Sequence, residues 1–222
     1  MKFCIFLAWV VSASAETLHY SVNWPSGLSL GEATLVSEHS QTADKGSEAW
    51  RFGLEIDASV PGFAIRDNYH SSAAGELCSV ELFKSIAHGK KKNEEKISFD
   101  QQKNSITRET TNGGKADTSV SSCARDALSF LQFVRRELAQ GRVAPEQQVV
   151  FGSQYQVRIV FQGAQTIKVG DKMVETDRTA ATIKGPATDL TVEIFFARDA
   201  ARTPVLARLP LALGTFTVEL QP

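Results

Sequence analysis

Cys78 and Cys123 are the residues whose type points most clearly to a specific chemistry, the formation of a disulfide. The 222-residue chain has Cys4, Cys78 and Cys123, and Cys4 lies in an N-terminal apolar run that we expect to be removed. Two thiols in an oxidising compartment pair more often than they stay free. We therefore predict a disulfide between Cys78 and Cys123. The alternative is a nucleophilic Cys123, because a thiolate is favoured near a helix N-terminus.

The other reactive side chains show no spacing that is typical of a catalytic or metal site. The four histidines are scattered and lack metal-ligand spacing: His19, His39, His70 and His88. Metalloprotease, Walker, dinucleotide-binding and nucleophile-elbow motifs are absent from the sequence. We predict a protein that is not an enzyme and has no metal and no cofactor. A hydrolase whose acid/base pair only the fold assembles is the third hypothesis.

The charges limit the partners that this chain can have. The formal net charge is −1, which argues against nucleic acid, because phosphate binding needs a concentrated positive surface. The run Lys90-Lys91-Lys92 is either a contact for anionic lipid or a solvated hairpin end neutralised by the glutamates that follow. The segment Arg198–Arg202 has the same two interpretations, as an anion site or a turn with local ion pairs.

The N-terminus has the features of an export signal. Lys2 supplies a positive start, Phe3 to Val11 is an apolar run too short to span a bilayer, and Ala13-Ser14-Ala15 fits a cleavage site. We expect residues 1–15 to be a signal peptide and residues 16–222 to form a single exported domain, most simply in the periplasm. No later stretch is long and apolar enough to cross a membrane as a helix.

From Glu16 onward, apolar and polar residues alternate with period two, which is typical of strands with one buried face. The pattern is clear in residues 18–24, 50–57, 155–162 and 190–197. Short turns between such segments favour antiparallel neighbours. We predict a mainly β protein with a large curved antiparallel sheet, a half-barrel or open barrel of about ten strands. Segment 112–122, rich in Ser, Thr and Gly, is predicted to be a loop.

One helix interrupts the strands. Asp126 suits its N-cap, because a carboxylate accepts hydrogen bonds from free backbone N–H groups. Arg135 and Arg136 suit the negative end of the helix dipole, and Gly141 is a typical stop. Apolar residues recur on one face at three- and four-residue steps: Ala127, Phe130, Leu131, Val134 and Leu138. One such helix cannot cover ten strands, so the sheet must curl upon itself or leave a cavity beneath the helix.

The helix and the last strands resemble a known family. The string Asp126-Ala127-Leu128-Ser129, with Arg135, Leu138 and Gly141, is similar to a D-x-L-S…R…L-x-x-G pattern. Residues 195–205 are similar to a strand, an acidic turn and R-x-P-V. Both resemble the exported bacterial family labelled domain of unknown function 3108, over nearly the whole chain after the signal. The resemblance implies a shape like the half-barrels of lipoprotein-localisation factors, with a helix on the concave face. The family's frequent tryptophan and paired aspartates are replaced here by Phe196, Arg198 and Asp199.

These observations support two main hypotheses. The first is an exported binding protein that holds a lipid, an acyl group or another apolar small molecule between the sheet and the helix. The second is a scaffold that binds an envelope protein through sheet edges or hairpin ends. The apolar-pocket candidates, for which plain core packing is the alternative, are Trp50, Phe52, Phe130, Leu131, Val134, Tyr155 and Ile194.

Overall fold

The computed structural model describes residues 13–41, 48–60, 62–212 and 214–222. Most of the expected signal peptide, residues 1–12 with Cys4, lies outside the described residues. The first strand begins at Ala13, before the expected cleavage site after Ala15. A chain that begins at Glu16 would still keep the rest of this strand, so the signal peptide stays a prediction.

One sheet, antiparallel except at its β9–β10 pair, forms most of the molecule, and the sequence underestimated its strand number. About ten strands were predicted, and fifteen are present. They are β1 (Ala13–Asn23), β2 (Ser29–Gln41), β3 (Glu48–Val60), β4 (Phe63–Ala74), β5 (Cys78–His88), β6 (Lys91–Asp100), β7 (Ser105–Thr110), β8 (Lys115–Ser119), β9 (Arg125–Asp126), β10 (Gln147–Val150), β11 (Gln154–Val169), β12 (Lys172–Gly185), β13 (Thr188–Ala197), β14 (Pro204–Leu211) and β15 (Gly214–Leu220).

The strands that the sequence missed lack the signals on which the prediction depended. Strand β8 lies inside the segment predicted to be a loop, and all five of its residues are exposed. With no buried face, it shows no alternation of apolar and polar residues. Strands β9 and β10 are only two and four residues long, too short for a periodic pattern.

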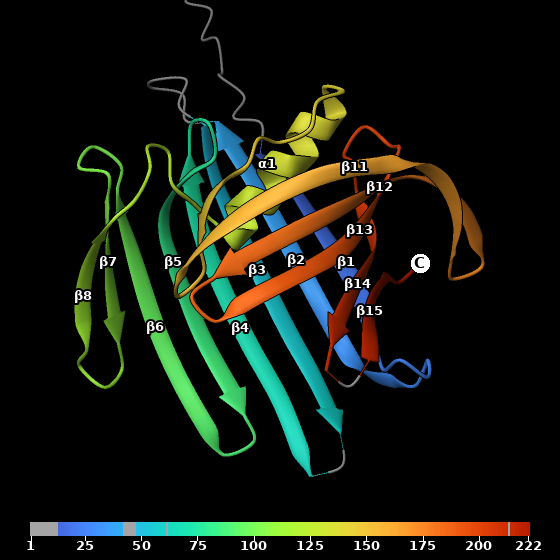
Figure 1. Ribbon diagram of the computed structural model, residues 1–222, viewed down its shortest axis with the longest axis horizontal. Helices are drawn as coiled ribbons and strands as arrows, with labels where there is room; N and C mark the ends of the chain where they lie inside the picture. The colour runs from blue at the N-terminus through green and yellow to red at the C-terminus, as the bar shows by residue number, and fades with distance from the viewer. Residues whose placement is uncertain (1–12, 42–47, 61, 213) are drawn as a thin grey trace, which may run out of the picture.

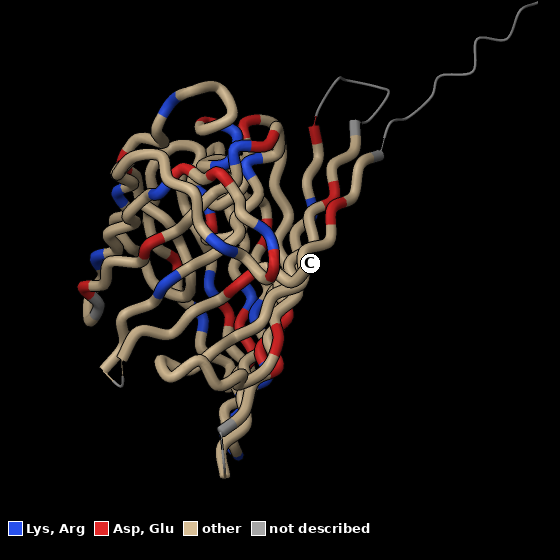
Figure 2. The backbone as a smooth tube through the Cα atoms, turned by 90° about the vertical axis from the view of Figure 1, so that its right-hand side faces the viewer, with Lys and Arg blue, Asp and Glu red and all other residues tan. Residues whose placement is uncertain are grey.

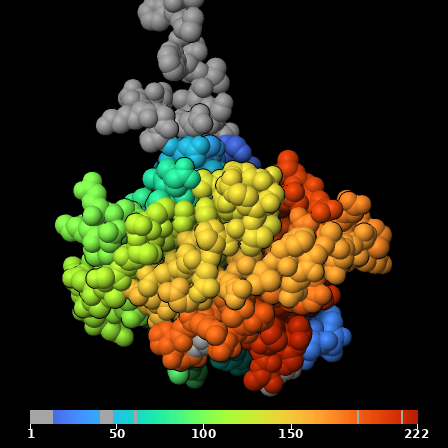
Figure 3. Space-filling view, turned by 45° about the horizontal axis from the view of Figure 1, so that its top comes forward, coloured from blue at the N-terminus to red at the C-terminus, as the bar shows by residue number. Residues whose placement is uncertain are grey.

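The sheet curls around the single helix α1 (Ala127–Ala139). Its strand order runs from β8 down to β1, then from β15 down to β9. Strands β11 to β13 cross in front of the helix, while β1 to β5 lie behind it (Figure 1). The space-filling view of the helix end shows α1 wedged between these two parts of the sheet (Figure 3). The concave face thus becomes the wall of a barrel that the helix partly fills.

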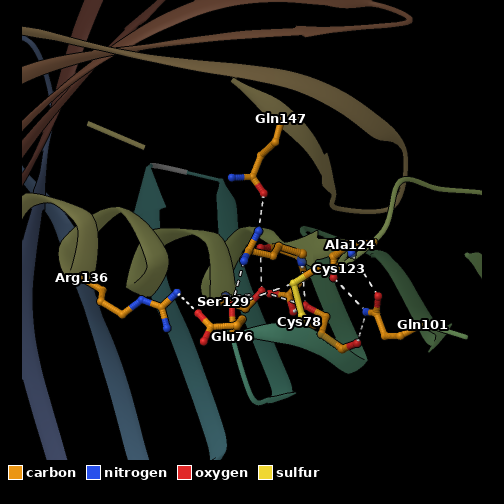
Figure 4. The surroundings of a disulfide bond; sticks show 11 residues. Glu76, Cys78, Gln101, Cys123, Ala124, Ser129, Arg136 and Gln147 are labelled. Atoms are coloured by element: carbon orange, nitrogen blue, oxygen red, sulfur yellow. Dashed lines mark hydrogen bonds and ion pairs between the residues drawn. A yellow bond between two sulfur atoms is a disulfide. The ribbon is translucent and has the colours of Figure 1, made fainter. Parts of the chain in front are cut away.

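The last strand of the order is joined back to β5, which closes the barrel. Strand β9 pairs in parallel with β10, and the Ser79 N–H on β5 donates to the Ala124 carbonyl at 2.9 Å. Beside this bond lies the predicted disulfide, Cys78–Cys123, with a Cα–Cα distance of 4.7 Å (Figure 4). The alternative of a free nucleophilic Cys123 is therefore wrong. Strands β6 to β8 extend beyond this closure as a wing.

The helix begins at a buried carboxylate, as predicted. Asp126 Oδ1 accepts from the backbone N–H groups of Leu128 and Ser129, at 2.8 and 3.1 Å. Asp126 Oδ2 accepts from the hydroxyls of Ser71 on β4 and Ser79 on β5, both at 2.5 Å. One side chain therefore caps the helix and fixes its start to two strands of the sheet. At the other end, Gly141 follows the helix with φ of +72°.

Arg135 has a different role from the one expected from the helix dipole. Its side chain is 3% exposed and pairs with both carboxylate oxygens of Glu16 on β1, at 2.7 and 2.8 Å. Its Nε–H also donates to the Ala201 carbonyl, in the β13–β14 turn, at 3.0 Å. Arg135 thus joins the helix to two separate parts of the sheet, whereas Arg136 pairs with Glu76 at 2.7 Å near the surface.

We expect Arg135→Met to lower the free energy of unfolding by about 2 kcal/mol. The substitution leaves the Glu16 carboxylate and the Ala201 carbonyl without their partner. The cost is below that of a fully buried pair because Glu16 is 30% exposed. The exposed Arg158→Met on β11 is the control, with an expected loss below about 0.5 kcal/mol. Urea unfolding measures both, and equal losses in the two variants would contradict this role of Arg135.

Candidate apolar binding site

An apolar pocket of about 160 Å³ lies between the helix and the inner face of the sheet. Leu128 and Leu131 contribute from α1, and the other residues come from β1 to β3 and β13 to β15. The lining, called the apolar pocket below, consists of Tyr20, Ala33, Leu35, Leu54, Leu128, Leu131, Ile194, Pro204, Leu206, Ala207 and Val218. The cavity expected from the mismatch between one helix and many apolar strand faces is therefore present, although most of that mismatch is removed by the curl of the sheet.

The one polar side chain in this lining has its hydrogen bond satisfied. The Tyr20 hydroxyl donates to the Pro204 carbonyl at 2.9 Å, between two residues of the same wall. Because the Tyr20 hydroxyl is already paired, no side chain of the lining has a free hydrogen-bonding group for a polar ligand or for a water molecule. The lining therefore favours an apolar occupant.

The structure brings two of the seven candidate residues to the apolar pocket. Leu131 and Ile194 line it. Phe52, Phe130 and Val134 are buried in the same hydrophobic core without lining the pocket. The other two candidates are half-buried at the margin of that core: Trp50, which stacks on His39 with ring centroids 4.2 Å apart, and Tyr155, whose ring lies against Gly185.

Most of the lining was missed because it comes from strands that the sequence could not place opposite one another. Tyr20 on β1, Leu54 on β3 and Leu206 on β14 each lie in clear strand segments. Their meeting depends on the β1–β15 pairing, which joins the two ends of the chain. Local alternation marks an inward face, but it does not show which inward faces meet.

A second set of inward residues is charged and holds the β10–β11 turn in place. Lys84 on β5 and Glu95 on β6 are buried, and Arg108 on β7 pairs with Glu95 at 3.0 Å. Lys84 Nζ donates to the Phe151 carbonyl at 3.3 Å and lies 4.5 Å from the centre of its ring. Burial lowers the pKa of Lys84, and the Glu95 carboxylate partly offsets that effect. Gly152 has φ of +87°, a conformation that favours glycine, and a Cβ there would also lie 2.8 Å from Lys84 Nζ.

The buried Tyr20 should make the free energy of unfolding depend on pH in the alkaline range. Burial is the main cause that raises its pKa; the Arg135 guanidinium acts in the opposite direction and the Glu16 carboxylate adds to the rise. The folded phenol therefore keeps its proton above pH 10, where the unfolded chain loses it, and stability falls as pH rises. We expect Tyr20→Phe to lose less free energy of unfolding than the wild type between about pH 9 and pH 11. Denaturant unfolding at both pH values checks this, and equal losses would contradict it.

In the part of the chain that the structure describes, no group of three or more His, Cys, Asp or Glu side chains is placed to hold a metal ion. The described helix is not long and apolar enough to cross a membrane. Acidic and basic residues are interspersed along the backbone (Figure 2).

The fold and the pocket define a class: a β-barrel-like protein with one helix inside and a small apolar pocket beside that helix. The chain belongs to the family described as protein of unknown function (DUF3108), whose model matches residues 18–221. It is similar in fold to the crystal structure of a β-barrel-like protein of domain of unknown function DUF1849 from Brucella abortus, with a TM-score of 0.60 and 5% identity over 96% of this chain and 98% of that one. No curated protein matches the chain.

Proposed function

We propose that this protein is an exported, non-enzymatic binding protein that holds an apolar group in the apolar pocket. The observation that carries the proposal is a pocket of about 160 Å³ whose only polar side chain is already hydrogen-bonded. Dry apolar cavities of about this size in other proteins bind benzene. Whole ligands of drug size occupy larger pockets, of about 300 Å³ or more. The pocket therefore suits one ring or a segment of an acyl chain, with the rest of a larger lipid outside it.

Export is supported by the disulfide and by the N-terminal sequence. A disulfide that closes the barrel is typical of proteins in oxidising compartments. The positive start, the apolar run and the small-residue site precede the domain in the order of a signal peptide. In a Gram-negative cell the periplasm is the compartment that fits both, and the ligand would then be a component of the cell envelope.

Filling the apolar pocket should weaken binding strongly while the fold is kept. Ala33 and Ala207 line it from β2 and β14, and Ala33→Leu with Ala207→Leu would occupy much of its volume. A fluorescent fatty acid titrated into the wild type should bind, and the double variant should bind at least tenfold more weakly. Ala116→Leu, on the exposed strand β8, is the matched control and should bind as the wild type does. Equal affinity in all three proteins, or no binding by the wild type, would contradict the proposal.

A scaffold is the second candidate, and the free edge of β8 favours it. Among the strands that the structure describes, β8 pairs with β7 alone and ends the strand order, with all five residues exposed. An open edge can accept a strand from another chain. The Asp117 N–H points to this open edge, because Thr118 and Ile106 form the hydrogen-bonded pair of the β7–β8 ladder. Recovery of one stoichiometric protein partner from envelope extracts, lost in Asp117→Pro and without any lipid, would favour this function over the first.

A further inference from the structure

Four of the hairpin turns at the end of the barrel opposite the helix belong to strands that are neighbours in the sheet, from β6 through β1 to β14. Turns in an antiparallel sheet alternate between its two ends, so the β1–β2, β3–β4 and β5–β6 turns share one end. The β14–β15 turn joins them, because Asn23 at the end of β1 pairs with Thr217 near the start of β15. Figure 1 shows these four turns at the lower edge of the sheet, away from α1. We call this set of turns the hairpin end.

Exposed apolar side chains lie on three of these four turns. Leu28 in the β1–β2 turn is 68% exposed, Phe63 at the start of β4 is 44% exposed, and Leu211 at the end of β14 is 50% exposed. Single exposed apolar residues are ordinary. Here three exposed apolar side chains lie at hairpin tips at the same end of the molecule. Since none of them is buried in the core, packing does not explain why they are apolar.

The β1–β2 and β14–β15 turns pack together through aromatic residues. The rings of Trp24 and Phe216 meet edge to face with centroids 5.0 Å apart. Gly214 lies so close to Pro25 that a Cβ there would be 2.7 Å from the proline ring. Leu28 and Leu211 therefore belong to two turns that pack on one half-buried aromatic pair, so the two exposed side chains are presented together at this end.

The fourth turn adds positive charge beside Phe63. The Phe63 ring lies 6.3 Å from the His88 ring, and the Gly89 N–H donates to the Ala64 carbonyl, so the β3–β4 and β5–β6 turns are neighbours. Lys90 and Lys91 are exposed there. Within the described residues neither makes an ion pair, whereas Lys92 pairs with Glu94 at 2.9 Å. The two interpretations of the lysine run therefore apply to different residues. Lys92 is neutralised by a neighbouring glutamate, as in a solvated hairpin end, whereas Lys90 and Lys91 remain available to an anionic lipid.

From this arrangement we infer that the hairpin end docks on an anionic lipid bilayer. The apolar tips enter the upper part of the acyl region, Trp24 lies at the interface, and Lys90 and Lys91 contact the phosphates. Separate tips on separate hairpins suit a fluid bilayer, which can surround each one, better than a protein surface, which would need a matching recess for each. Apolar insertion together with basic residues is the combination that gives peripheral membrane binding.

Vesicle flotation tests this directly, with vesicles of phosphatidylglycerol and phosphatidylethanolamine compared with phosphatidylcholine alone. The wild type should float with the anionic vesicles and not with the neutral ones. Leu28→Ser with Leu211→Ser should bind at least tenfold more weakly, and so should Lys90→Glu with Lys91→Glu. The control is Met173→Ser with Lys103→Glu. Met173, in the β11–β12 hairpin, is 68% exposed like Leu28, and Lys103 lies beyond the other end of β6.

The inference is overturned if the wild type does not bind anionic vesicles, or if the control loses as much binding as the hairpin-end variants. If only the lysine variant loses binding to anionic vesicles, the apolar tips do not insert into the bilayer and that part of the inference is wrong. All of these positions are exposed, so near-UV circular dichroism should be unchanged in each variant. The inference does not depend on the apolar pocket: the fatty-acid titration tests the pocket, vesicle flotation tests the hairpin end, and either can fail alone.

Discussion

Replacing Asp126 by alanine is expected to lower the free energy of unfolding by about 3–5 kcal/mol. The loss of the helix N-cap costs about 1 kcal/mol. The hydroxyls of Ser71 and Ser79 both donate to Asp126 Oδ2 in a fully buried position. The Ser71 hydroxyl is left without this partner, which costs about 1–3 kcal/mol, whereas the Ser79 hydroxyl keeps Ser129 Oγ at 2.7 Å and loses one hydrogen bond, worth about 1 kcal/mol. The barrel loses, in one substitution, the side chain that fixes the start of the helix to β4 and β5. Urea unfolding measures the loss.

Two further variants separate the cap from the bonds to the sheet. Asp126→Asn keeps the oxygen that accepts from Leu128 and Ser129 but replaces the one that the serines use, so a loss of about 1–2 kcal/mol is expected. Asp171→Ala, at a fully exposed position with only a 3.8 Å contact to Lys168, should cost less than about 0.5 kcal/mol. A loss at Asp126→Ala as small as that of Asp171→Ala would contradict the role of Asp126.

Removal of the disulfide, by Cys78→Ala with Cys123→Ala, is expected to cost about 3–4 kcal/mol. The bond closes a loop of 46 residues, from 78 to 123 inclusive, and loop-closure entropy predicts a value of this size. The loop contains β5 to β8, so the bond ties the whole wing to the barrel closure at β9. We expect the double variant to unfold at a lower urea concentration than the oxidised wild type.

Chemical reduction provides the matched control for that prediction. Dithiothreitol should shift the wild type to the midpoint of the double variant, and the double variant should not respond to it. If the oxidised and reduced wild type unfold at the same urea concentration, the disulfide does not stabilise the closure of the barrel.

The sequence predicted those features that depend on local pattern or on residue chemistry. The helix, its cap at Asp126 and the stop at Gly141 are confirmed, because capping and apolar spacing are local properties. The Cys78–Cys123 pairing followed from there being two cysteines after the expected signal. The D-x-L-S…R pattern now has a physical explanation: Asp126 caps the helix, Ser129 contacts Ser79 at 2.7 Å, and Arg135 joins the helix to β1.

Features that depend on long-range pairing were not predictable from one sequence. Glu16 and Arg135 are 119 positions apart, and no local signal connects them. The apolar pocket forms only because the first and last strands are neighbours and β11 to β13 cross in front of the helix (Figure 1). The alternation of apolar and polar residues along each strand would be the same in a sheet that did not curl in this way. Strand β8 was missed because both of its faces are exposed.

Native mass spectrometry with lipid extraction, on protein purified from the cell envelope of its own host, tests the proposed function most directly. We predict that the wild type carries a bound apolar small molecule and that the variant with Ala33→Leu and Ala207→Leu, purified in the same way, does not. A wild type that is free of any small molecule, or a filled variant that carries the same molecule as the wild type, would contradict binding in the apolar pocket.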